Sequence, residues 1–126
     1  MPALARLFLV CGALSAMLAV ILGAFGAHAL QGRLTAQMLS VYHTAAQYQF
    51  YHALGMLAIG ILAARPQPMP GLRWAGYLMI AGTVLFSGSL YALSVTGVRG
   101  WGAITPLGGV AFIAAWAILA IAVLRA

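Results

Sequence analysis

The sequence predicts an all-α fold, a four-helix transmembrane bundle that forms one integral membrane domain over residues 1–126. Hydrophobic residues make up 65% of the chain and charged residues only 5%, whereas about 25% of a soluble domain is charged. There is no Asp or Glu, and every cation is an arginine at or just beyond the end of a long apolar run. These runs are each about 20 residues long, the length that a helix needs to cross a bilayer.

The first span is predicted over residues 7–30, where a long apolar run follows Arg6. Within it Ala19, Gly23 and Ala27 repeat at four-residue spacing. Small residues at this spacing let helix backbones approach closely in membranes. We therefore expect this stripe to face a neighbouring helix.

The second span is predicted over residues 45–64, but its helix is expected to begin near Thr35. No Gly or Pro interrupts residues 35–54, and Thr35 is a suitable N-cap. A helix of about 30 residues is about 45 Å long and exceeds the roughly 30 Å hydrocarbon core. Its first turns should therefore project into the headgroup region.

The third and fourth spans are predicted over residues 74–95 and 104–124. A segment with three prolines, residues 65–71, precedes the third span, and proline disfavours helix both at its own position and at the residue before it. Residues 96–100 contain two glycines and form the predicted turn between the last two spans. All four spans should be helices, because backbone exposed to lipid must satisfy its own hydrogen bonds.

The distribution of arginines predicts the orientation. If all four spans cross, one side of the membrane holds both termini and the Pro-rich loop. That side carries Arg6, Arg65, Arg73 and Arg125, and the other side carries Arg33 and Arg99. Cytoplasmic loops are enriched in cations, so both termini are expected in the cytoplasm. Arginine without lysine, in a chain rich in Ala and Gly, favours a bacterial origin and hence a multi-pass protein of the inner (plasma) membrane.

The charge pattern also bears on partners and activity. Nucleic-acid-binding proteins cluster their cations on one face, but here the arginines are dispersed, so the lipid bilayer is the expected partner and nucleic acid is not. A homo-oligomer or a partner membrane subunit stays open. Without a carboxylate, a Ser-His-Asp arrangement cannot be built, and no phosphate-binding or nucleophile motif is present. The sequence therefore predicts a protein that is not an enzyme.

Polar side chains fall in the half of each span that is expected to face outward. If the second span begins near residue 45, His52 lies about 10 Å below the surface, where a polar residue should face the bundle. We expect His28 and His52 to point inward and to share one patch with Ser87 or Ser89 and with Tyr91. The candidate ligand-binding cluster comprises His28, Tyr48, Gln49, His52, Ser87, Ser89, Tyr91 and Thr105.

Several interpretations of this cluster stay open. A buried histidine can be a hydrogen-bonding strut between helices, and that interpretation predicts a structural, accessory, or ligand- or lipid-binding membrane protein. No cofactor and no metal are predicted, since there is no carboxylate, no second thiol and no pair of histidines four residues apart. Haem, quinone or metal at His28 and His52, in a respiratory accessory protein, is one alternative. A small oligomeric transporter is another.

Four stretches resemble a known family. They are Leu-Gly-Ala-Phe-Gly-Ala-His-Ala-Leu (22–30), Gln-Tyr-Gln-Phe-Tyr-His-Ala-Leu (47–54), Leu-Phe-Ser-Gly-Ser-Leu-Tyr (85–91) and Ile-Thr-Pro-Leu-Gly-Gly (104–109). Together they resemble the small four-helix inner-membrane proteins called domain of unknown function 423, which include YgdD-like bacterial members and the animal transmembrane protein 256. The resemblance implies four membrane helices and supplies no activity. It places the candidate cluster, with Pro106, inside the shared motifs.

Overall fold

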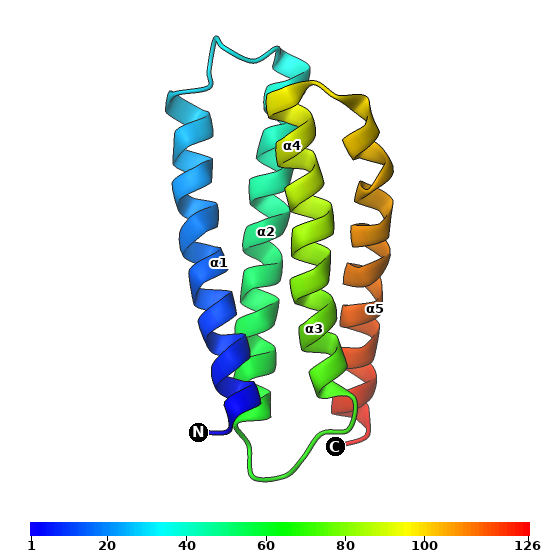
Figure 1. Ribbon diagram of the computed structural model, residues 1–126. Helices are drawn as coiled ribbons and strands as arrows, with labels where there is room; N and C mark the ends of the chain where they lie inside the picture. The colour runs from blue at the N-terminus through cyan, green and yellow to red at the C-terminus, as the bar shows by residue number, and fades with distance from the viewer.

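The computed structural model describes residues 1–126 as four long helices that run side by side (Figure 1). The third of them contains a short π-helical segment, and a 3-10 turn precedes the last. The elements are α1 (Ala3–His28), α2 (Ala36–Ala63), α3 (Leu72–Gly82), the π-helix η1 (Thr83–Ser87), α4 (Gly88–Thr96), the 3-10 helix η2 (Arg99–Ala103) and α5 (Thr105–Leu124). The predicted all-α four-helix fold is confirmed. Both termini and the Pro-rich loop lie at one end of the bundle (Figure 1).

The start of α2 agrees with the prediction. Thr35 is its N-cap, and the Thr35 hydroxyl accepts a hydrogen bond of 3.1 Å from the backbone N–H of Met38. The helix then continues without a break to Ala63. The polar stretch before the predicted second span is therefore regular helix.

Three helices are long and apolar enough to cross a membrane: Ala3–His28, Leu72–Thr96 and Arg99–Leu124. The helix α2 is as long as these but is not among them, because Gln47, Gln49 and His52 interrupt its apolar sequence. It is instead the helix with the most buried residues. It runs beside the other three (Figure 1), so the predicted crossing by α2 stays a prediction.

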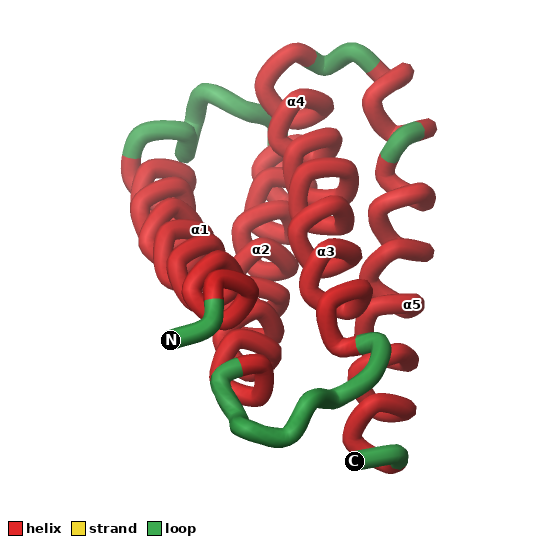
Figure 2. The backbone as a smooth tube through the Cα atoms, turned by 60° about the horizontal axis from the view of Figure 1, so that its bottom comes forward, coloured by secondary structure: helices red, strands yellow, loops and turns green.

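The two central helices of the bundle are α2 and the continuous α3–η1–α4 helix (Figures 1 and 2). On one side α1 packs along α2 and meets α3 mainly near its own start, where Phe8 lies against Gly76 and its ring is 5.6 Å from that of Tyr77. On the other side α5 packs along α3 and η1 and reaches α2 with Phe112 and Trp116. The outer helices therefore flank a central pair.

The buried face of each helix repeats every seven residues. In α1 the repeat is made by Ala5, Gly12, Ala19 and Gly26, and in α2 one of three such series is Tyr42, Gln49 and Met56. This repeat is typical of helices that wrap around each other with a left-handed supercoil. The predicted four-residue stripe is wrong, because Gly23 faces open space and Ala27 is exposed.

Two features of the second half of the chain differ from a plain helical hairpin. The π-helix η1 interrupts the predicted third span, and the backbone of its Phe86 lies against Gly108 of α5 so closely that a Cβ there would clash. The predicted turn over residues 96–100 continues into η2, which leads into α5. Gly97 has a φ of 71° at the end of α4, a conformation that glycine adopts without strain.

Candidate functional site

Gln49 of α2 joins three helices at the centre of the bundle. Its side chain is buried, its Nε2 donates to the carbonyl oxygen of Ser15 on α1 at 3.1 Å, and its Oε1 accepts from the Tyr91 hydroxyl on α4 at 2.7 Å. Both ends of the amide are thus paired, as a polar group in a low-dielectric interior requires. The main role of Gln49 is therefore to connect α2 with α1 and α4.

Tyr42 extends this connection by two turns toward the start of α2. Its hydroxyl donates to the carbonyl oxygen of Leu22 on α1 at 2.6 Å, and its ring meets the ring of Tyr91 edge-on at 5.2 Å. The ring occupies the space that a side chain at Gly26 would need. Together Tyr42, Gln49 and Tyr91, with the carbonyls of Ser15 and Leu22, form what we call the Gln49 network.

His52 belongs to a separate group of rings between α2, η1 and α5. Its ring stacks on Phe112 with 3.4 Å between centroids and 10° between planes, and Tyr48 stacks on Phe86 at 4.7 Å. Tyr48 is 38% exposed, whereas His52 is buried. Tyr48, His52, Phe86, Phe112 and Trp116 form what we call the His52 aromatic cluster.

The hydrogen bond of His52 determines its tautomer. Its Nδ1 lies 2.6 Å from the Tyr48 carbonyl oxygen of the same helix. A carbonyl only accepts, so Nδ1 carries the hydrogen and Nε2 presents a lone pair in the uncharged ring. The imidazole therefore joins helices through stacking, and its one available polar atom is an acceptor.

A third polar contact joins the start of α4 to the start of α5. The hydroxyls of Ser89 and Thr105 lie 2.6 Å apart, and the Ser89 hydroxyl also lies 2.9 Å from the Phe86 carbonyl oxygen. Ser87, at the end of η1, is fully buried, and its hydroxyl has no hydrogen-bond partner. Ser89 therefore connects α4 to α5 by a hydrogen bond, whereas the Ser87 hydroxyl forms no hydrogen bond.

The expected position of His28 is wrong. His28 is exposed at the end of α1 and makes no hydrogen bond through its side chain. In the antiparallel pair, Gly12 lies against the Ala53 carbonyl and so is level with His52. His28 is about 24 Å further along α1 at a rise of about 1.5 Å per residue. The two imidazoles therefore cannot hold one cofactor between them.

The single patch expected from the sequence resolves into three separate contacts. Gln49 and Tyr91 meet as expected, but Ser89 and Thr105 form their own pair, and His52 with Tyr48 joins the aromatic cluster. No group of three or more potential metal ligands exists. The sequence interpretation missed Tyr42, although it lies seven residues before Gln49 on the buried repeat and could have been found there.

A cleft of about 300 Å³ lies between α1 and the α3–η1 segment. Gln49 and Met56 of α2 form its floor, and the Ser15 hydroxyl at its edge is buried without a hydrogen-bond partner. Its walls are Cys11, Leu14, Ser15 and Leu18 from α1, and Ile80, Thr83 and Val84 from α3 and η1. The lining is mainly apolar, and the Gln49 network closes its inner side.

Comparison with known proteins identifies the family of the chain. The family model described as protein of unknown function (DUF423) matches residues 22–109. The chain is 51% identical over 120 residues to the UPF0382 membrane protein YwdK of Bacillus subtilis, covering 95% of this chain and 98% of the relative. It is 49% identical over 120 residues to the UPF0382 membrane protein SERP0230 of Staphylococcus epidermidis, covering 95% and 97%. No solved structure matches. The chain is thus a membrane protein, and it belongs to the DUF423 family of proteins of unknown function.

Proposed function

We propose that this protein is a non-enzymatic, multi-pass protein of the bacterial inner membrane that binds one amphipathic lipid through the cleft between α1 and α3–η1. The polar contacts between helices hold the bundle together, and the cleft takes an apolar chain from the bilayer. The cleft with its buried polar floor is the observation that carries the proposal.

The walls of the cleft support a lipid as its occupant. Leu14, Leu18 and Val84 are 51%, 46% and 66% exposed, so the cleft opens sideways toward the bilayer. Binding sites for small molecules are mostly apolar with few polar groups that fix orientation. An acyl or isoprenoid chain matches such walls.

The polar groups beside the cleft support an occupant that also carries a polar group. Each polar atom of the Gln49 side chain has a partner within the protein, but the Ser15 hydroxyl has none. An unpaired buried hydroxyl costs about 1–3 kcal/mol, and rotation of the Ser15 side chain toward the cleft would let an ester or hydroxyl group of a ligand supply the missing partner. The π-helix η1, which contributes Thr83 and Val84, also supports a site here, because such segments are frequent at functional sites.

The proposal is tested by native mass spectrometry of the detergent-purified protein, which counts lipids that survive removal of the bulk bilayer. We expect the wild type to retain one lipid more than Leu18→Trp, in which the larger side chain fills the cleft. Val20→Trp is the matched control, since Val20 is an exposed residue of α1 that lines no cavity. Equal retention in the two variants would show that lipid binds elsewhere.

A cofactor at His52 is the second candidate, because its Nε2 presents a free lone pair beside the rings of Phe112 and Trp116. A quinol hydroxyl or a metal-bearing macrocycle could use that atom, with His52 as its one imidazole contact. An absorbance spectrum of the purified protein tests this alternative. For a transporter the structure offers less support, since all three cavities lie at the periphery and none continues through the bundle.

A further inference from the structure

We propose that the end of the bundle that holds both termini carries a second site, in which Arg73 and Trp74 bind the phosphate headgroup of an anionic phospholipid. This site is distinct from the cleft and does not depend on the proposed function. It lies where the Pro-rich loop turns into α3.

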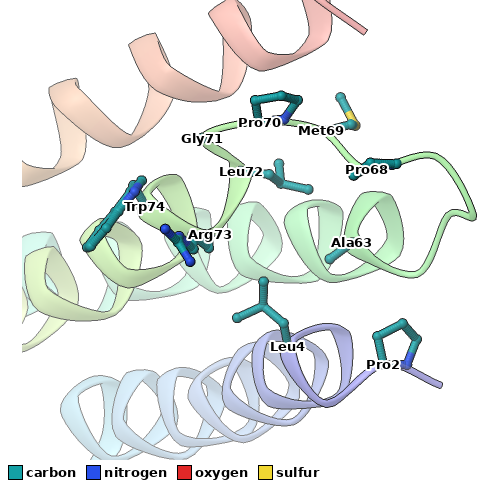
Figure 3. Close-up of a pocket in the computed structure, with 10 residues that line it drawn as sticks. All are labelled: Pro2, Leu4, Ala63, Pro68, Met69, Pro70, Gly71, Leu72, Arg73 and Trp74. Carbon is teal, nitrogen blue, oxygen red and sulfur yellow. The ribbon is translucent and has the colours of Figure 1, made fainter.

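The site is a cavity of about 500 Å³ between the start of α1, the end of α2 and the start of α3. Figure 3 shows Pro2 and Leu4 on one side, Ala63 behind, and the loop that carries Pro68 and Pro70 around the other side. Pro68 and Pro70 fix their own φ angles, so the rim loses little conformational freedom when a ligand binds.

Arg73 and Trp74 supply the recognition chemistry. The guanidinium of Arg73 lies 5.1 Å from the centre of the Trp74 ring, and both side chains are exposed. Trp74 also lines a neighbouring cavity of about 300 Å³ that contains Arg125. Two arginines therefore flank one tryptophan, and arginine pairs with phosphate oxygens through two parallel N–H donors.

No acidic side chain in the protein neutralises these cations. The chain contains no Asp or Glu, so no salt bridge to a side chain is available to any of its arginines. This end therefore carries an excess of positive charge, and anionic lipid headgroups are the anions that a membrane presents at this depth. The backbone N–H of Arg73, which has no acceptor at the start of α3, adds a further donor beside the guanidinium.

The apolar part of the cavity favours a phospholipid over free phosphate. Leu4, Ala63 and Leu72 line the side that faces the bundle, opposite the exposed Arg73. Trp74 is 53% exposed, as expected of a tryptophan at the boundary between headgroups and acyl chains. A diacyl lipid can place its phosphate at Arg73 and its glycerol region against Leu4 and Leu72.

The test is a native mass spectrometry titration of the purified protein with phosphatidylglycerol, phosphatidylcholine or inorganic phosphate. We expect phosphatidylglycerol to bind more tightly than phosphatidylcholine and inorganic phosphate not to bind. Arg73→Gln should weaken phosphatidylglycerol binding about fivefold, in line with the contribution of one arginine at an anionic surface. Arg73→Lys should retain part of the preference for phosphatidylglycerol.

Arg99→Gln is the matched control, because it removes an equally exposed arginine from the opposite end of the bundle. It should leave the Arg73-dependent preference for phosphatidylglycerol over phosphatidylcholine unchanged, and so should Leu18→Trp, whose cleft is a separate site. Equal weakening by Arg73→Gln and Arg99→Gln would overturn the proposal in favour of diffuse charge attraction. Equal binding of both lipids, or saturation by inorganic phosphate, would also overturn it.

Discussion

Individual side chains in this bundle act mainly as connections between helices. Gln49 contacts α1 through Ser15 and α4 through Tyr91, and Tyr42 binds α1 through Leu22. In hydrocarbon there is no hydrophobic force between helices, so packing and such hydrogen bonds determine how they associate. The polar residues that look like a binding site in the sequence are therefore explained first by folding.

We expect Gln49 and Tyr91 to be energetically coupled. Gln49→Leu leaves the Tyr91 hydroxyl without a partner and removes the hydrogen bond to the Ser15 carbonyl, and Tyr91→Phe leaves the Gln49 amide oxygen without a partner. Hydrogen bonds between membrane helices contribute about 0.6 kcal/mol on average and up to about 1.7 kcal/mol. The double variant should therefore lose less stability than the two single losses summed, by about that amount.

Thermal unfolding in detergent measures this coupling. His28→Ala and His52→Ala form the control pair, because these residues lie at different levels of the bundle and should give additive losses. Additive losses at Gln49 and Tyr91 would mean that the hydrogen bond between them contributes no measurable stability.

At the scale of elements, the sequence predicted what depends on composition and on strong local signals. The four helices, the long α2 and its cap at Thr35 follow from apolar runs and from the positions of Gly and Pro. The packing face of α1 could not be predicted in this way. Small residues recur along α1 at intervals of both four and seven residues, and only the contact with α2 determines which of the two series is buried. The direction of the His28 side chain depends on which face of α1 packs against α2, since His28 lies on the face that α2 leaves uncovered.

The π-helix η1 could not be read from the sequence either. Its residues, Thr83–Ser87, lie in an apolar run and include no Gly or Pro that would signal a change of helix type. The contact that accompanies it is long-range, because Gly108 lets α5 approach the backbone of Phe86. The local sequence therefore predicts a helix over these residues, and tertiary packing determines that the helix is a π-helix here.

That contact gives a prediction for α5. Gly108→Ala should destabilise the protein by about 1–3 kcal/mol, since the added methyl group meets backbone atoms of Phe86 that cannot move away independently. Gly23→Ala is the matched control within a helix, because open space surrounds Gly23. It should be neutral or stabilising by up to about 1 kcal/mol, as alanine is the better helix former.

Thermal unfolding of both glycine variants in the same detergent tests the prediction. If Gly108→Ala were as stable as Gly23→Ala, α5 would not be held against η1 as tightly as the structure indicates. Binding of lipid to Gly108→Ala is a useful second measurement, since the cleft is lined by Thr83 and Val84 of the same π-helix.

At the scale of the whole molecule, charge and polarity are divided between the two ends. The cavity with Arg73 lies at the end that holds the termini and the Pro-rich loop, where Arg6, Arg65 and Arg125 also lie. The Ser89–Thr105 contact and the contact of Tyr42 with α1 lie toward the other end, which has only Arg33 and Arg99. The bundle is therefore asymmetric along the direction in which it is expected to cross the membrane.

This asymmetry predicts the orientation, with both termini in the cytoplasm. Arginine-rich ends stay on the cytoplasmic side during insertion, and the end with the termini has four arginines against two. A green fluorescent protein fused after Ala126 should fluoresce, and alkaline phosphatase fused there should be inactive. Phosphatase fused within the turn at Gly97 should be active. The reverse pattern would place Arg73 and its cavity outside the cytoplasm. Moving Arg65 and Arg73 to the opposite loop by substitution should then shift the balance of the two reporters, because the margin rests on two charges.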